Sequence, residues 1–153
     1  MKRHESIVIL SREHHFGLLF GWKIRQGIQK QVPPERILPY VKYFWENHLL
    51  LHFREEETIL FASLENELVD QARFEHNQIE QLVAQLMIRK MVQPEQLNML
   101  TVLLDHHIRF EERILFPYLE KELPEDKLLA IGMELQQLDY RRQKDTYPDE
   151  FWR

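Results

Sequence analysis

Two stretches of the chain place a histidine and a glutamate four residues apart within nearly the same surrounding sequence. One runs over residues 52–68 and begins with His52 and Glu56, and the other runs over 107–123 and begins with His107 and Glu111. Residues four apart lie one above the other on the same face of a helix. An imidazole and a carboxylate held together in this way are suitable ligands for iron, manganese or zinc.

Apolar residues flank both pairs at helical spacing, which predicts that the pairs face the core. These residues are Leu49, Ile59 and Leu60 near His52, and Leu100, Leu103, Leu104, Ile114 and Leu115 near His107. A lone His-x-x-x-Glu pair is most simply a surface contact of little consequence. Here the motif occurs within a repeated segment, and a buried ionised carboxylate needs a cation because its desolvation is costly. The repetition therefore favours a metal site.

Two further segments supply histidines on apolar helical stripes, namely His76 and one of the adjacent pair His14 and His15. Adjacent helical residues point about 100° apart, so only one of that pair can face the metal. We favour His15, because Leu18, Leu19 and Trp22 follow it at helical spacing, and keep His14 as the alternative. Two carboxylates that can each span two ions favour a dinuclear centre over a single zinc ion.

Other polar residues near these positions have more than one interpretation. His48, one turn before His52, is a fifth ligand, a hydrogen-bond partner of a ligand, or a core histidine. Glu80, one turn after His76, is either a ligand or an exposed side chain. The glutamates that follow the two proposed bridges are expected to be solvated or paired with arginines; these pairs are Glu57 with Arg54 and Glu112 with Arg109.

Hydrophobic periodicity and proline positions predict an all-α, up-down-up-down antiparallel four-helix bundle with a short C-terminal fifth helix. The expected helices span about 11–31, with Ser11 as N-cap, then 35–63, 65–90 and 94–116, and a shorter one after Pro124. Pro117 is expected to bend or end the fourth helix. We expect one domain over residues 1–153, with a core bundle of about 7–122 and a C-terminal helix and tail over 124–153.

Composition limits the function further. Of the 153 residues none is cysteine, which excludes disulfides, iron–sulfur clusters and thiol nucleophiles. A formal net charge of −5 without a basic stripe argues against nucleic acid as a partner. The apolar run near the N-terminus is too short for a signal peptide, and no stretch is long enough to span a membrane, so a cytoplasmic protein is expected. The aromatic tail, with Tyr140, Tyr147, Phe151 and Trp152, is expected to cap the bundle rather than form a dimer contact.

These motifs together resemble the hemerythrin-like (HHE cation-binding) domain. The resemblance covers residues 7–122 and rests on Leu-Ser-Arg-Glu-His-His at 10–15, the two His-x-x-x-Glu segments, and Glu75-His76. Glu80 stands where the oxygen-carrying hemerythrins have a second histidine, and Glu111 stands where they have an aspartate after a longer gap. Both differences are similar to the bacterial members and to the iron-sensing or iron-repair branches.

The resemblance implies a non-haem di-iron centre, with Fe²⁺ or Fe³⁺ ions bridged by carboxylates and by an oxo or hydroxo group. Carried over to this sequence, it implies Glu56 and Glu111 as bridges, and His15, His52, His76 and His107 as terminal ligands. The implied function is binding of, or response to, O₂, NO or iron, with no catalytic side chain. Alternatives are a di-iron enzyme that reduces peroxide or NO or repairs iron centres, and a structural bundle with zinc or no metal. A redox partner protein and a homodimer are further possibilities.

Overall fold

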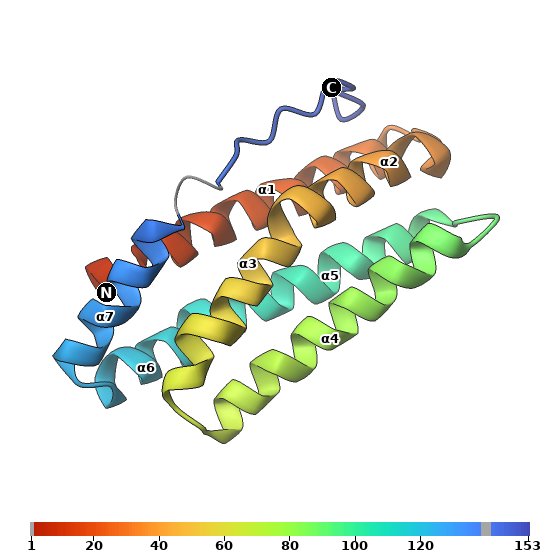
Figure 1. Cartoon of the computed structure of the whole chain (residues 1–153). Helices are drawn as coiled ribbons and strands as arrows, with labels where there is room; N and C mark the ends of the chain where they lie inside the picture. Colours follow the sequence, from red (N-terminus) through yellow and green to blue (C-terminus); the bar gives the residue numbers. More distant parts are fainter. Residues whose placement is uncertain (1, 139–141) are drawn as a thin grey trace.

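Four long helical segments form the bundle in the computed structural model, which describes residues 2–138 and 142–153. The first segment is α1 (Val8–Gln29), the second contains α2 (Pro34–Phe44) and α3 (Leu50–Glu55), the third is α4 (Glu67–Ile88), and the fourth contains α5 (Pro94–Phe110) and α6 (Phe116–Glu122). A further helix, α7 (Glu125–Gln137), follows. Successive segments run in opposite directions, and α1 lies beside α5 (Figure 1). The expected all-α bundle is confirmed.

Turns of π-helix interrupt the second and fourth segments at corresponding places. One spans Glu56–Leu60 and the other spans Glu111–Leu115, so each begins at the glutamate of a His-x-x-x-Glu pair. A third, Trp45–Leu49, joins α2 to α3. A π-turn holds one residue more than a regular turn, and such turns are frequent at functional sites. The repeated sequence thus folds into a repeated distortion beside both glutamates.

The π-turns change which side chains are buried after each glutamate. The regular helical period predicts Ile114 on the core face, but its side chain is 50% exposed, whereas Leu115 and Phe116 are fully buried. The extra residue in the turn moves the buried positions one place along the chain. Pro117 does not end this segment, since it occupies the first turn of α6 directly after the π-turn. There the regular hydrogen-bond series is already interrupted, and the missing N–H of a proline is tolerated.

The N-terminal segment also differs from expectation. A 3₁₀ turn, Glu5–Ile7, precedes α1, and the side chain of His4 caps it by accepting a hydrogen bond from the Ser6 backbone N–H. The helix therefore begins before Ser11, and Ser11 is not its N-cap. Its hydroxyl instead donates to Glu112 at 2.8 Å.

The core consists of two apolar clusters separated by a layer of buried polar side chains. One cluster contains Phe20, Tyr40 and Leu104, and the other contains Leu10, Phe61 and Phe116. On each long segment the buried histidine or glutamate lies between residues of the first cluster and residues of the second. The apolar clusters position the polar layer near the middle of the bundle.

The C-terminal tail packs along the bundle, in agreement with the expected capping role (Figure 1). Phe151 is 2% exposed and lies in the core cluster, and a Cβ added to Gly27 would come within 2.8 Å of its ring. Tyr147 and Trp152 pack against the same cluster. Tyr140 lies outside the described residues.

Among the described helices, none is long and apolar enough to cross a membrane.

Candidate metal centre

The polar layer contains four histidines and two glutamates, all of which are almost inaccessible to solvent. They are His14 on α1, His52 on α3, His76 on α4, His107 on α5, and Glu56 and Glu111 at the starts of the two π-turns. None of the six is more than 4% exposed. All four long segments of the bundle contribute to this layer, so the site depends on the complete fold.

Each glutamate contacts histidines on both sides of the layer. The Oε1 atom of Glu56 lies 3.3 Å from His52 Nε2 and 3.1 Å from His76 Nε2. The Oε1 atom of Glu111 lies 2.8 Å from His14 Nε2 and 3.4 Å from His107 Nε2. Two four-residue groups result, and in each the ligand atoms lie within 4.8 Å of one another. They are His14, His52, Glu56 and Glu111, and Glu56, His76, His107 and Glu111.

Several atoms that point into this layer have no hydrogen-bond partner among the described residues. They are Nε2 of His52, His76 and His107, both carboxylate oxygens of Glu56, and Oε2 of Glu111. Buried polar atoms are nearly always satisfied, because an unpaired one loses its hydration without compensation. Imidazole nitrogens and carboxylate oxygens that converge in this way have the donor set of a metal site. The residues therefore fit bound cations.

The opposite nitrogen of each histidine ring is paired with a different carboxylate. The Nδ1 atoms of His52 and His76 lie 2.9 Å from Glu13 and Glu57. Those of His107 and His14 lie 2.8 Å from Glu75 and 3.0 Å from Glu112. An ionised carboxylate can only accept, so Nδ1 donates and the Nε2 lone pair of a neutral ring is free for a metal ion. Carboxylate partners of this kind orient metal-ligating histidines and increase their basicity.

These carboxylate partners reveal a sequence signal that the metal-ligand spacing alone did not. The dipeptide Glu-His occurs at 13–14 on α1 and again at 75–76 on α4. In each, the histidine enters the polar layer and the glutamate accepts from the histidine of a neighbouring helix. Because His14, like His76, directly follows a glutamate, the repeated Glu-His dipeptide selects His14 over His15.

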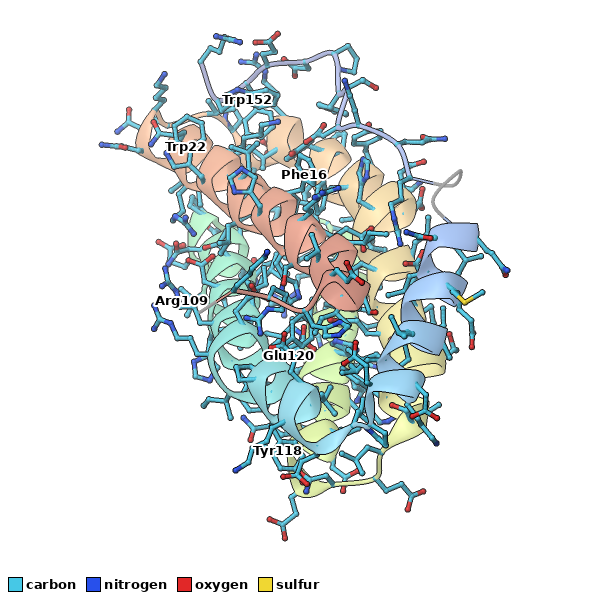
Figure 2. The ribbon with its side chains drawn as sticks, turned by 90° about the vertical axis from the view of Figure 1, so that its left-hand side faces the viewer. Phe16, Trp22, Arg109, Tyr118, Glu120 and Trp152 are labelled. Carbon is cyan, nitrogen blue, oxygen red and sulfur yellow. The ribbon has the colours of Figure 1, made fainter. Side chains whose placement is uncertain are left out.

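The structure does not bring His15 to the site, and the preference for it was wrong. His14 is 3% exposed, whereas His15 lies on the exposed face of α1. The apolar residues that favoured His15 do not define the core face, because Trp22 is 45% and Leu19 is 37% exposed (Figure 2 shows Trp22 on α1). Three glycines of α1 are buried instead, where they allow close packing, and a Cβ at Gly17 would come within 2.9 Å of Ile108.

The ambiguous residues also take definite places. Glu80 pairs with Arg54 at 3.1 Å on the surface and does not enter the layer. Glu57 pairs with Arg54 as expected, at 3.0 Å, in addition to its contact with His76. Glu112 contacts Arg3 rather than Arg109. His48 is half-buried and belongs to neither four-residue group.

Electrostatic coupling across the layer shifts the pKa values of both residue types. Burial opposes a charge on His52, but the nearby charge of Glu56 and the hydrogen bond to Glu13 raise its pKa to about 9. Burial and the charge of Glu111 oppose ionisation of Glu56, but His52 and His14 lower its pKa to about 2. The pKa of His76 rises for reasons similar to those for His52. Protons on the imidazoles therefore balance the carboxylates until cations replace them.

Aromatic rings shield the layer from solvent. Phe53 stacks on His76 with ring centroids 3.9 Å apart, and Phe116 stacks on His14 at 5.1 Å. Both phenylalanines are almost fully buried. Their contacts hold the imidazole rings in place and exclude water, which strengthens interactions between the buried charges.

Comparison with protein families supports the same interpretation. The family model described as "Hemerythrin HHE cation binding domain" matches residues 9–119, which include all six residues of the layer. The chain belongs to this family, and its buried histidine and glutamate clusters fit the cation binding that defines it. Comparison with curated proteins and with solved structures gave no match.

Proposed function

We propose that the polar layer binds two iron ions, with Glu56 and Glu111 as bridging ligands. In this assignment His14 and His52 complete one site, and His76 and His107 complete the other. The observation that carries the proposal is that the two four-residue groups share the same two glutamates. Each of these carboxylates contacts histidines of both groups and would therefore hold both ions when they are bound.

The charge of the layer supports bound cations. Three of the outer carboxylates already have arginine partners, namely Glu13 with Arg142, Glu57 with Arg54 and Glu112 with Arg3. With neutral imidazoles, the charges of Glu56 and Glu111 remain uncompensated in a region of low dielectric constant. Cations bound between these two carboxylates would compensate them.

The donor set favours iron over zinc. Each site has two nitrogen and two oxygen donors from the protein and no sulfur. Four donors saturate a structural, tetrahedral zinc ion. Iron takes a higher coordination number, so the same four donors leave positions for a small exogenous ligand.

We further propose that the function is to bind or respond to O₂ or NO. The iron pair supplies the redox chemistry and the open coordination positions when it is bound. The protein's own residues hold the ions, keep the histidines in the tautomer with a free Nε2, and exclude water through Phe53 and Phe116. No side chain is assigned a catalytic role.

The test is addition of each gas to anaerobic protein loaded with ferrous iron. We expect NO or O₂ to produce a new visible or near-ultraviolet absorption band that saturates at a fixed amount of gas per iron pair. Glu111→Ala, loaded in the same way, is the control for iron outside the site. Absence of any spectral change with both gases contradicts the gas-binding proposal. Continuous consumption of gas with an added reductant replaces it with an enzymatic function.

A pair of neighbouring substitutions tests the histidine assignment. We expect His14→Ala to lose about half of the bound iron or more, because it removes a ligand of one site and the partner of Glu112. His15→Ala should retain the iron content of the unchanged protein, since this side chain is exposed. Elemental analysis of both variants, prepared side by side, provides the measurement. Retention of iron by His14→Ala together with loss by His15→Ala contradicts the assignment.

A further inference from the structure

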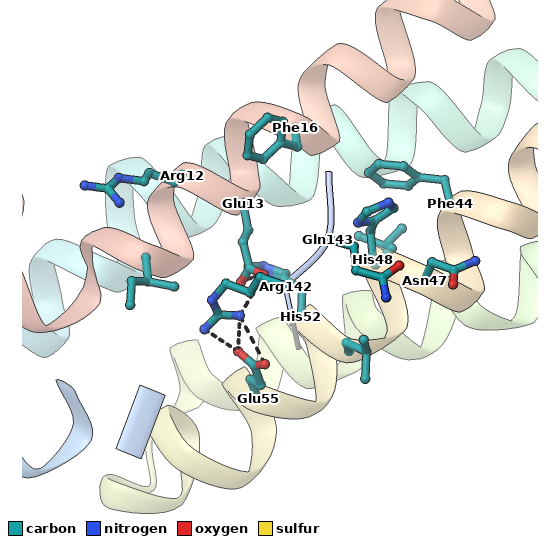
Figure 3. Close-up of a pocket in the computed structure, with 13 residues that line it drawn as sticks. Arg12, Glu13, Phe16, Phe44, Asn47, His48, His52, Glu55, Arg142 and Gln143 are labelled. Carbon is teal, nitrogen blue, oxygen red and sulfur yellow. Dashed lines mark hydrogen bonds and ion pairs between the residues drawn. The ribbon is translucent and has the colours of Figure 1, made fainter. Parts of the chain in front are cut away.

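A cavity of about 130 Å³ lies beside the proposed metal centre, and His52 forms part of its wall. It is bounded by α1, by the segment that joins α2 to α3, and by the tail at residues 142–143 (Figure 3). Most of its wall is apolar, formed by Ile9, Phe16, Phe44, Leu49 and Leu51. Apolar cavities of about 150 Å³ hold a benzene molecule. The volume of this cavity is thus suited to a molecule with a single six-membered ring.

His48 provides a polar group on the wall of this cavity. Figure 3 shows its ring beside Phe44, and the ring centroids lie 5.0 Å apart. Its Nε2 atom is buried and has no hydrogen-bond partner among the described residues. Burial lowers the pKa of His48, so the ring is neutral at pH 7. A neutral ring nitrogen in this position is suited to one hydrogen bond with a ligand.

The charged residues at the cavity balance one another. Arg142 of the tail lies 3.0 Å from Glu13 and 2.9 Å from Glu55, and the Arg142–Glu55 contacts are drawn in Figure 3. Arg12 adds a second positive charge to the lining. Two cationic and two anionic side chains favour neither a cation nor an anion, since either one would lie near a group of like charge. The lining is therefore suited to a neutral ligand.

We propose that this cavity binds a neutral molecule made of one six-membered aromatic ring with a single hydroxyl group, of which phenol is the simplest. The ring occupies the apolar part, and the hydroxyl pairs with His48 Nε2. A hydroxyl both donates and accepts, so it pairs with either tautomer of the imidazole. None of the proposed contacts of the ligand is to a metal ion, so its binding can be measured separately from the iron content.

The experiment measures binding of phenol and of benzene to the full chain by NMR, at millimolar ligand concentrations. We expect phenol to bind more tightly than benzene and to give intermolecular NOEs to the methyl groups of Leu49 and Leu51. His48→Phe should remove that preference and weaken phenol binding about 2- to 12-fold, the range expected for one hydrogen bond. Benzene binding should change little.

A matched pair of neighbouring variants tests the location. Leu51→Phe places a ring in the cavity and should abolish binding of both probes. Leu50→Phe is the control, because Leu50 is also half-buried but does not line the cavity. Circular dichroism verifies that both variants fold, and the NOEs locate the ligand even without a variant. The proposal is overturned if neither probe binds, if binding survives Leu51→Phe, or if phenol loses no affinity in His48→Phe. Iron content, measured on the same samples, tests the metal centre separately.

Discussion

Glu111→Ala is expected to remove most of the bound iron, with a loss far larger than any substitution of a neighbouring glutamate. Glu111 is fully buried and its oxygens lie close to the Nε2 atoms of three histidines. The substitution takes one oxygen donor from each proposed site and leaves a cavity between the ligand histidines. Both ions lose a ligand at once, so we expect a loss of affinity of more than about 100-fold, beyond the range of about 10- to 100-fold for an outer partner of a ligand.

Two other glutamates complete a graded series. Glu112→Ala keeps both buried glutamates and removes the partner of His14 Nδ1, and substitution of such partners costs about 10- to 100-fold in metal affinity. Glu80→Ala removes a surface contact with Arg54 and should leave iron binding unchanged. Iron titration of the three variants, with circular dichroism to verify folding, gives the order. Equal affinities for Glu111→Ala and Glu80→Ala would show that the buried carboxylate is not a ligand.

Removal of the metal is expected to lower the melting temperature at neutral pH by on the order of 10 °C. A ligand present at about 1,000 times its Kd stabilises the folded state by about 4 kcal/mol, and each kcal/mol shifts the Tm of a domain of this size by about 2–4 °C. Without cations, the ligand histidines must take up protons to compensate Glu56 and Glu111. Calorimetry of iron-loaded and chelator-treated protein provides the comparison.

The difference in stability between the iron-loaded and the metal-free protein should increase from pH 6 to pH 9. In the metal-free protein the pKa of His52 is raised to about 9, so its stabilising contribution is complete below its unfolded pKa of about 6.5. This contribution is lost as the pH rises through about 9. In the iron-loaded protein the histidines are neutral, and protons compete with iron as the pH falls. A metal-dependent stabilisation that is constant over this range would contradict the proposed ligand role of the histidines.

Much of the fold and part of the site follow from local sequence. The two His-x-x-x-Glu segments, His76 and the helical periodicity predict four converging helices and five of the six residues in the polar layer. The regular helical period gives wrong buried positions where α-helix changes to π-helix. Because π-turns begin at Glu56 and Glu111, the buried positions that follow do not keep the regular spacing, and Ile114 becomes exposed.

The choice between His14 and His15 required information that apolar spacing does not contain. The packed face of α1 is marked by small residues, such as Gly17 and Gly21 against α5, while Trp22 remains partly exposed. The carboxylate partners of the histidines were also not predicted, because Glu13 and Glu75 each reach a histidine on a different helix. Such contacts depend on how the helices pack, which no single segment specifies.

The most direct test of a shared dinuclear centre is the number of iron ions held per chain. Metal-free protein is loaded with excess ferrous iron without oxygen and desalted, and iron and protein are then quantified by elemental and amino-acid analysis. The two groups that share Glu56 and Glu111 predict two iron ions per chain. A saturating value of one ion per chain, or retention of zinc in preference to iron, would contradict the account.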